Sequence, residues 1–359
     1  MICFSGRRST LEALGDRTLR SHILITNEDT FPIVRDYGFW GSGKRGIPSS
    51  MEALIASNLR NPHQPYFSMV CDMLGTRDGD TVFIYERQAG FHGVYEIAGA
   101  PFFDTTTVGC IDGTWPIRIL LRCVHFFPKP VPEDLLFSTR ANEERLWTWF
   151  YRKIQGGRAL NTINPEAALA IIEMLVKLNG NASEQHCSTG VYTPSGFQPL
   201  HLPLGKGSSF PLEDILRAWL ISNIDDPARM DMPAIFGPVN DMEWFANNVP
   251  YHVSRKNIDV LVYHKNYRYT NHELRYKYSV VELKKDRADE KDVDQVIRYS
   301  KWVAGRLADG ENNIVQPVLI AYDFTPSAIN KARTTDFNDG CVLEIAYRIE
   351  DGNVTTGLV

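Results

Sequence analysis

The sequence lacks most of the motifs that indicate a particular chemistry. Its six cysteines are scattered, and none forms a Cys-x-x-Cys pair, so zinc binding and thioredoxin-like chemistry have no support. The histidines show no His-x-x-x-His spacing, and there is no Gly-x-Ser-x-Gly elbow and no Rossmann fingerprint. The glycine-rich segment around Lys44 lacks the Gly-x-x-x-x-Gly-Lys-Ser/Thr spacing of a phosphate-binding loop.

Long apolar runs and low-complexity tracts are also missing. No stretch approaches the roughly 20 apolar residues of a membrane span, and the N-terminus has no hydrophobic region of signal-peptide length. We therefore expect a cytoplasmic protein with reduced cysteines and no membrane partner. The 359 residues, 43% hydrophobic and 23% charged, are enough for two globular domains.

The overall charge gives no sign of a nucleic-acid-binding protein, but the charge is unevenly distributed. The formal net charge is -5, whereas residues 252–306 contain 13 Lys or Arg against 8 Asp or Glu. Specific binding of DNA requires a basic face and not a basic total. The composition therefore neither supports nor excludes DNA as a partner.

The most informative pattern is one aspartate followed by a Glu-x-Lys on a short apolar run. Asp259 precedes an apolar segment, and Glu282 and Lys284 lie in Ser-Val-Val-Glu-Leu-Lys. Side chains alternate along a strand, so Glu282 and Lys284 point to one face while Val281 and Leu283 point into the core. Two carboxylates can hold a hard divalent cation, and a lysine can orient water and offset negative charge. This combination suits metal-assisted hydrolysis of a phosphodiester.

The same residues also allow a purely structural interpretation. Asp259 could cap a hairpin, and Glu282 with Lys284 could form a weak ion pair on a solvated strand face. The flanking segments favour the first interpretation because they bring further polar residues to the same region. Residues 210–220 have the apolar period of a helix and carry Glu213, and a second helix beginning near residue 292 places Gln295 and Tyr299 one turn apart.

Residues 205–335 resemble the PD-(D/E)XK nuclease superfamily, in the order helix, strand, strand, helix, strand. The resemblance implies that Asp259 and Glu282 bind Mg²⁺ or Mn²⁺ and that Lys284 positions the attacking water. It also implies that Glu213 completes the metal shell or orients Lys284, while Gln295 and Tyr299 match the Gln-x-x-x-Tyr motif of RecB-like and NucS-like branches. The chain departs from the pattern at Ile258, where the nominal motif has proline.

The N-terminal half is predicted to be rich in β-structure. Short strands are expected at residues 22–26, 80–85, 93–99 and 118–124, separated by glycines. This pattern suggests a small barrel. Gly-Asp before a strand, Gly-x-x-Glu-x-x-Gly, an aromatic-Asp pair and Pro-x-Arg together resemble an EVE domain of the PUA-like fold over residues 20–180. The resemblance implies binding of a modified base in an aromatic pocket.

Residues 39–46 are predicted to form a glycine-rich, basic loop that lines this pocket. Phe39, Trp40, Ser42 and Trp115 are the candidate pocket side chains, with Trp40 placed to stack on a base. Lys44 and Arg45 of the same loop could meet phosphate. An aromatic pair beside a barrel can equally belong to the core.

The predicted fold class is therefore α/β and β-barrel in two domains. An N-terminal PUA-like, EVE-type barrel with flanking helices is expected at residues 1–182, a linker at 183–209, and an α/β restriction-endonuclease-like domain at 210–359. Residues 140–180 are expected to be helical, with Asn164 and Pro165 starting one helix that ends near Asn179 and Gly180.

Together the two resemblances imply a modification-dependent restriction endonuclease that cuts double-stranded DNA, acting as a homodimer because a double cut usually requires two single-site copies. Two alternatives remain from the sequence. One is a NucS-like repair nuclease that recognises DNA structure. The other is a non-catalytic protein that binds modified DNA or RNA.

Overall fold

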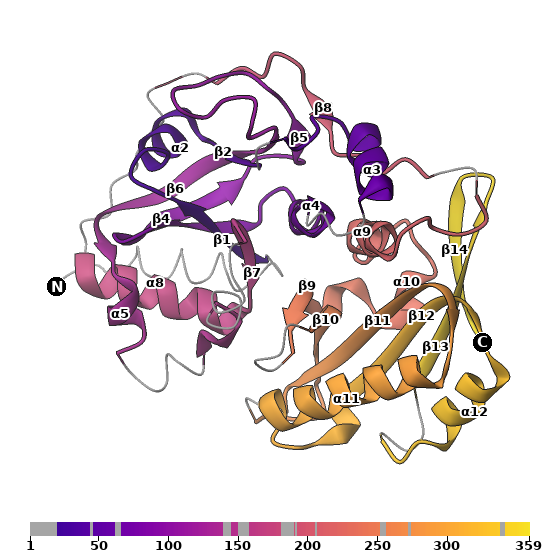
Figure 1. The fold of residues 1–359 in the computed structure, drawn as a ribbon. Helices are drawn as coiled ribbons and strands as arrows, with labels where there is room; N and C mark the ends of the chain where they lie inside the picture. The colour runs from indigo at the N-terminus through magenta and orange to yellow at the C-terminus, as the bar shows by residue number, and fades with distance from the viewer. Residues whose placement is uncertain are drawn as a thin grey trace.

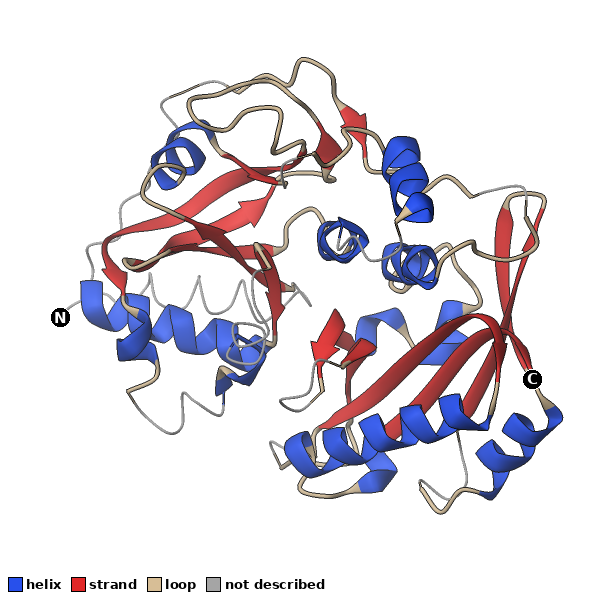
Figure 2. Ribbon diagram, viewed as in Figure 1, coloured by secondary structure: helices blue, strands red, loops and turns tan. Residues whose placement is uncertain are grey.

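The computed structural model describes residues 20–43, 46–61, 66–138, 145–149, 158–180, 190, 192–204, 207–251, 256–271, 274–337 and 342–359. Two β-sheets, each with its own helices, make up these residues (Figure 2). We call the described residues up to 204 the N-terminal unit and those from 207 the C-terminal unit. The α/β part of the predicted class is confirmed. The β-barrel, the family assignments and the boundaries 182/183 and 209/210 stay predictions.

The sheet of the N-terminal unit mixes parallel and antiparallel pairs. Its order is β7-β1-β3-β4-β6-β5-β8, with β2 paired to β6. β1 and β3 run parallel, so the chain must cross over between them, and α2, α3 and α4 lie in that crossover. The strands are β1 (Ser21–Thr26), β2 (Phe39–Ser42), β3 (Thr81–Glu86), β4 (Gly90–Ile97), β5 (Phe102–Phe103), β6 (Ile117–Val131), β7 (Leu160–Ile163) and β8 (Gln198–Pro199).

The helices of this unit are α2 (Phe31–Tyr37), α3 (Met51–Arg60), α4 (Tyr66–Leu74), α5 (Glu133–Leu136) and α8 (Pro165–Asn179). α8 starts after Asn164, has Pro165 in its first turn and ends at Gly180, whose φ of 62° suits glycine. These predicted ends are confirmed. α8 packs under β4 and β6 and buries Ile171 and Leu175 (Figure 1).

Two local predictions for the N-terminal unit were wrong. Phe39 to Ser42 form strand β2 and not a loop, because the segment pairs with β6 and all four residues are buried. Residues 160–163 form strand β7 and not helix, since they pair with β1 and fill the edge of the sheet. Lys44 and Arg45 lie outside the described residues.

The sheet of the C-terminal unit has the order β14-β13-β12-β11-β10-β9. β11, β12 and β13 are parallel to one another, and the outer pairs are antiparallel. The strands are β9 (Met242–Pro250), β10 (Asn257–Lys265), β11 (Tyr276–Ala288), β12 (Val315–Phe324), β13 (Leu343–Glu350) and β14 (Asn353–Leu358). The helices are α9 (Glu213–Asn223), α10 (Met232–Phe236), α11 (Glu290–Leu307) and α12 (Pro326–Thr334), with 3-10 turns η1 (Val239–Asp241) and η2 (Asn312–Ile314).

The predicted succession of helix, strand, strand, helix and strand is confirmed by α9, β10, β11, α11 and β12. α11 is the crossover between parallel β11 and β12 and starts with a reciprocal cap between Asp289 and Asp292. Alternate residues of β11 face opposite sides, so Val281 and Leu283 share a core with α9 while Val280 shares one with α11. Figure 1 shows α11 and α12 on one face of the sheet and α9 on the other. Strands β9, β13 and β14 were not predicted.

The two units meet through helices α4 and α9, which pack side by side (Figure 1). Phe67 and Val70 of α4 and Leu216 and Trp219 of α9 belong to one continuous hydrophobic core. Asp225, just after the end of α9, accepts hydrogen bonds from Arg20 and Arg77 of the N-terminal unit. Burial of apolar surface therefore joins the units as well as stabilising each.

Among the described residues, no helix is both long enough and apolar enough to span a membrane.

Candidate active site at the ends of β10 and β11

Asp259 and Glu282 lie on neighbouring strands at the point where their pairing ends. β10 and β11 are antiparallel with Val260 opposite Val281, and continuing this register by one residue places Asp259 beside Glu282 on the same face. Oδ2 of Asp259 accepts a hydrogen bond of 2.9 Å from the backbone N–H of Leu283. Both carboxylates are buried, with exposed fractions of 7% for Asp259 and 2% for Glu282. The predicted pairing of these two residues in space is therefore found.

The other predicted residues of the Glu-x-Lys pattern and of α11 contact Glu282. Nζ of Lys284 lies 2.7 Å from Oε1 of Glu282, and Nε2 of Gln295 donates a hydrogen bond of 2.5 Å to the same oxygen. Gln295 also lies 3.2 Å from the hydroxyl of Tyr299, one turn further along α11. Asp292, at the start of α11, places Oδ1 3.6 Å from Nζ of Lys284. The strand and the helix thus form one polar cluster.

Glu213 joins this cluster from the first turn of α9. Its Oε2 lies 3.9 Å from Nζ of Lys284, and its side chain is 40% exposed. A pocket of about 500 Å³ opens on Glu213, Asp214 and Lys284. The pocket therefore reaches the Glu213 and Lys284 side of the cluster. Both roles predicted for Glu213, completing the metal shell and orienting Lys284, stay predictions.

Arg217 is a site residue that the sequence argument missed. It is buried on α9, and its Nη1 donates to Oδ1 of Asp259 and to Oδ1 of Asn248, both at 3.1 Å. Its Nη2 pairs with Asp214. Asn248 in turn donates a bond of 3.0 Å to Oγ of Ser68 on α4, which belongs to the N-terminal unit. The available signal was an arginine one turn after Glu213 on the same side of the predicted helix.

Burial and mutual repulsion shift the ionisation of the two glutamates. Burial first, and then the charge of Asp259, raises the pKa of Glu282 to about 9. The same two causes raise the pKa of Glu213 to about 7. Burial alone would lower the pKa of Lys284, but the charges of Glu282 and Glu213 outweigh it and raise that pKa above its usual range. The ionised forms of Glu282 and Glu213 therefore favour the cationic form of Lys284.

The cluster has one feature that suits a bound cation. Oε2 of Glu282 is buried and has no hydrogen-bond partner among the described residues. A buried carboxylate oxygen left without a partner is costly, and a divalent cation would satisfy it. Across the described ranges, no three carboxylate, imidazole or thiol groups are close enough to form a metal site by themselves. Asp259 and Glu282 would therefore hold a cation whose other ligands are water or phosphate oxygens, as Mg²⁺ prefers.

The four side chains predicted for the base pocket lie around strands β2 and β6. Phe39, Trp40 and Ser42 are almost fully buried, at 0%, 2% and 1% exposure. Nε1 of Trp40 donates to the carbonyl of Ile25, and Oγ of Ser42 contacts the sulfur of Met69. These contacts occupy the polar atoms of Trp40 and Ser42 within the unit. Their role in binding a base stays a prediction.

Trp115 is partly buried and lies at the rim of the same region, next to Gly41. The aromatic face of Phe39 is covered by Tyr192, which no sequence motif indicated.

No family model and no curated protein matches this chain. Among solved structures, a hypothetical protein from Leishmania major is 12% identical with a TM-score of 0.30, and covers 45% of this chain and 96% of its own length. A protein from Rhodopseudomonas palustris is 15% identical with a TM-score of 0.29, covering 47% and 99%. Human THYN1, solved in complex with DNA containing 5-methylcytosine, is 10% identical with a TM-score of 0.28, covering 45% and 98%. These scores are too low to carry an argument.

Proposed function

We propose that this protein is a metal-dependent endonuclease that hydrolyses phosphodiester bonds of DNA after its N-terminal unit recognises a modified base. One observation carries the nuclease part. Asp259 and Glu282 lie side by side at the ends of paired strands, and the ammonium of Lys284 contacts the carboxylate of Glu282. The second, buried oxygen of that carboxylate accepts no hydrogen bond from any residue that the structure describes. Two carboxylates that can hold a metal ion and a lysine that offsets negative charge suit hydrolysis of a phosphodiester.

Asp259 and Glu282 would hold Mg²⁺ or Mn²⁺ through their oxygens. The ion would polarise the phosphate and lower the pKa of water that it binds. Glu282 must lose its proton to take this role, and Lys284 at 2.7 Å favours the ionised form. Arg217 of α9 fixes the position of the Asp259 carboxylate on β10 through its 3.1 Å hydrogen bond.

Lys284 would orient the attacking water and offset the negative charge that develops on the phosphate. Its ammonium is held by three carboxylates, because Glu213 and Asp292 lie within 3.9 Å of Nζ in addition to Glu282. Of these, Glu213 lines the pocket through which substrate would enter. Gln295 fixes Glu282 from α11, and Tyr299 extends that contact.

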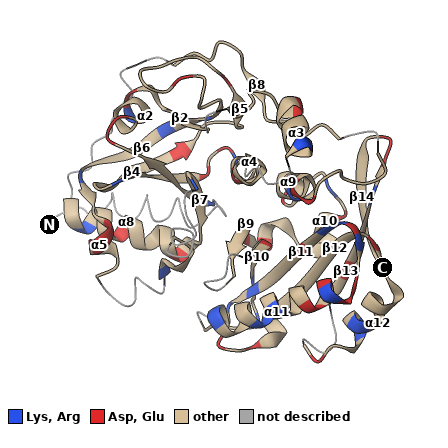
Figure 3. Cartoon of the chain, viewed as in Figure 1, with Lys and Arg blue, Asp and Glu red and all other residues tan. Residues whose placement is uncertain are grey.

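Recognition of a modified base by the N-terminal unit rests on its sequence motifs and on an aromatic face beside a buried ion pair. Phe39 supplies that face, and the Asp104–Arg118 pair, at 2.8 Å, supplies donors and acceptors. Exposed Lys and Arg on α11, among them Arg298, Lys301 and Arg306, could contact the phosphate backbone (Figure 3). A homodimer would supply the second active site for a double-strand cut.

The test is a cleavage assay with Mg²⁺ or Mn²⁺ on matched duplexes. They carry unmodified cytosine and adenine, 5-methylcytosine, 5-hydroxymethylcytosine, N4-methylcytosine or N6-methyladenine. We expect the wild-type protein to cut one modified duplex, and the Asp259→Ala variant to cut none. Cleavage of mismatched or branched DNA instead would favour a structure-specific repair nuclease. Tight binding without any cleavage would favour a protein that only binds modified nucleic acid.

A further inference from the structure

The ring of Tyr192 lies on Phe39 in the geometry of a stacked base. The two ring centroids are 4.0 Å apart and the planes differ by 21°. The guanidinium of Arg118 lies 5.3 Å from the centroid of Phe39 and 5.5 Å from that of Tyr192. The ring of Phe102 is nearly parallel to that of Tyr192, with 6.5 Å between the two ring centroids. Aromatic stacking of this kind is how proteins hold a base that has left its duplex.

The polar end of Tyr192 meets a buried ion pair. Its hydroxyl donates a bond of 2.6 Å to Oδ2 of Asp104 and accepts one of 2.9 Å from Nη1 of Arg118. The side chains of Asp104 and Arg118 are both 0% exposed. Burial opposes ionisation of Asp104, but the hydrogen bonds of Tyr192 and Thr106 and the charge of Arg118 hold its pKa below the usual range. The place that the Tyr192 ring occupies, stacked on Phe39 and bonded to the Asp104–Arg118 pair, would therefore suit another planar ring with a polar edge.

Tyr192 belongs to an exposed segment that is held mainly by hydrogen bonds to Asp104, Thr106 and Pro101. We call residues 192–204 the strap. Between Tyr192 and Leu200, most residues are exposed, and Phe197 is 53% exposed. Ser195 and Gly196 bond to Oδ1 of Asp104, and the two residues of β8 pair with β5. Local opening of such a segment requires little loss of buried surface.

We propose that Tyr192 is an internal substitute for a nucleobase, and that a base entering the site displaces it and releases the strap. This inference rests on the proposed function, in which the N-terminal unit recognises a modified base. The ring and hydroxyl of Tyr192 imitate the ring and the polar edge of a base. The two occupants exclude each other because both require the face of Phe39 and the polar atoms of Asp104 and Arg118.

The polar atoms indicate the class of base. Displacement of the Tyr192 hydroxyl frees an acceptor position on Oδ2 of Asp104 and a donor position on Nη1 of Arg118. A base that presents an amine donor beside a ring-nitrogen acceptor satisfies both, as cytosine and adenine do. The ligand class is therefore an amino-substituted base, with methylated cytosine and methylated adenine as the forms to compare.

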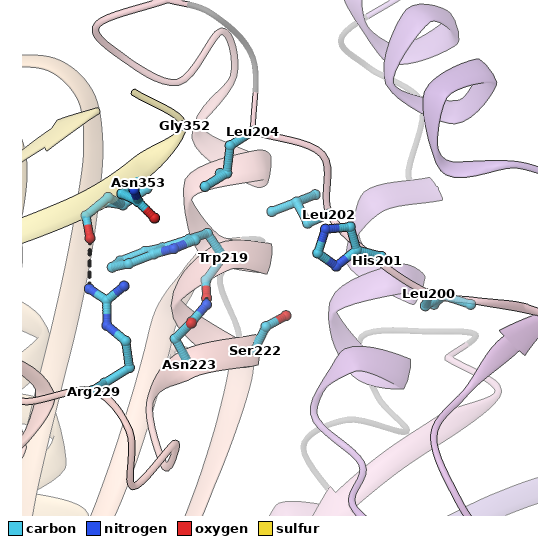
Figure 4. A pocket seen from close by; sticks show the side chains of 11 residues that line it. Leu200, His201, Leu202, Leu204, Trp219, Ser222, Asn223, Arg229, Gly352 and Asn353 are labelled. Atoms are coloured by element: carbon cyan, nitrogen blue, oxygen red, sulfur yellow. Dashed lines mark hydrogen bonds between the residues drawn. The ribbon is translucent and has the colours of Figure 1, made fainter. Parts of the chain in front are cut away.

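The strap continues to the helix that carries the candidate active site. Leu202 belongs to the same hydrophobic core as Trp219 of α9. Figure 4 shows Leu202 and Leu204 of the strap near Trp219, among the residues that line a pocket of about 500 Å³. α9 also carries Glu213 and Arg217 of the candidate active site. Release of the strap would therefore be transmitted to α9 through this contact.

The experiment measures binding without cleavage, so that it is independent of the nuclease proposal. The full-length protein is titrated in EDTA against fluorescein-labelled duplexes with one 5-methylcytosine, one N6-methyladenine or no modification, and anisotropy is recorded. We expect Tyr192→Ala to bind one modified duplex on the order of tenfold more tightly than wild type, because the competing ring is gone. Tyr192→Phe, which keeps the ring and loses the hydroxyl, should fall between the two. Tyr267→Ala, at an exposed tyrosine of the C-terminal unit, is the matched control and should bind as wild type.

Hydrogen exchange on the wild-type protein supplies a second readout that does not depend on a variant. Saturating modified duplex should increase exchange in residues 192–200, whereas a strap that stays in place would show unchanged or slower exchange. If wild type binds a modified duplex but Tyr192→Ala binds no more tightly and the strap does not open, the internal-substitute proposal is overturned and base recognition stands. If neither protein binds any duplex, the base site itself is overturned.

Discussion

Nη1 of Arg217 lies 3.1 Å from Oδ1 of Asp259, inside the boundary between α9 and the second sheet. Both side chains are buried, and the same guanidinium reaches Asn248, whose amide bonds to Ser68 of the N-terminal unit. The positive charge of Arg217 on α9 and the negative charge of Asp259 on β10 therefore stabilise each other. This contact connects the candidate active site to the neighbouring unit.

Replacing Arg217 by methionine should destabilise the protein by about 3–5 kcal/mol, because it leaves the buried charge of Asp259 without its partner. Urea unfolding of Arg217→Met, Asp259→Asn and the double variant measures the effect. The double variant should lose clearly less than the sum of the two single losses. Losses that simply add would show that the two side chains do not interact.

The raised pKa of Glu282 makes the free energy of unfolding depend on pH, and the direction of the shift determines the sign of that dependence. Its pKa is raised to about 9 in the folded protein from an ordinary value near 4.5, so the folded state binds the extra proton between these values. The stabilising contribution is complete below about pH 4.5 and is lost as pH rises toward 9, at a slope of at most about 1.4 kcal/mol per pH unit.

Glu282→Gln removes this titration while keeping the shape of the side chain. In EDTA, the variant should gain stability relative to wild type as the pH is raised from 5 to 9, measured by urea unfolding. Titrating groups outside the cluster of Glu213, Asp259, Glu282 and Lys284 are common to both proteins and cancel in the difference. A difference that does not change with pH would contradict the raised pKa.

Gln295 holds Oε1 of Glu282 at 2.5 Å from α11. Gln295→Ala should therefore lower the cleavage rate by about 10- to 100-fold, with a higher Mg²⁺ concentration needed for half-maximal rate. The matched control is Asp294→Ala on the adjacent residue, whose carboxylate pairs with Lys331 instead. Equal cleavage rates for the two variants would show that Gln295 does not contribute to catalysis.

Asp225 accepts hydrogen bonds from two arginines of the N-terminal unit, Arg20 at 2.8 Å and Arg77 at 2.6 Å. Asp225→Ala should lower the free energy of unfolding by about 2 kcal/mol, because it leaves both cations without this partner. Asp323→Ala, in an exposed ion pair with Arg287, is the control and should change stability by less than about 1 kcal/mol. Thermal unfolding followed by calorimetry measures both, and equal losses would show that Asp225 contributes no more than a surface pair.

The sequence was informative where local pattern determines position. Alternation along a strand places Glu282 and Lys284 on one face, and helical spacing places Gln295 one turn from Tyr299, so these neighbours follow from short segments alone. The pairing of β10 with β11 brings Asp259 next to Glu282. Few registers of these two antiparallel strands bury both Val260 and Val281, so this neighbour also follows from the hydrophobic pattern.

The residues that were missed depend on contacts between distant segments. Arg217 acquires its role only because α9 packs against the sheet and brings it to Asp259. Tyr192 lies in a stretch expected to be a linker, and its contact with Phe39 depends on how the strap crosses the first sheet. Neither placement is encoded in the period or composition of the surrounding residues.

The central claim is that Lys284 acts at a phosphodiester, and its neighbour offers a direct comparison. Lys284 contacts Glu282 within the cluster, whereas Lys285 pairs with Asp286 at the surface. Single-turnover cleavage of the preferred modified duplex should fall by a factor on the order of 1,000 in Lys284→Ala and stay close to wild type in Lys285→Ala. Lys284→Ala protein that is folded and cuts as fast as wild type would contradict the account.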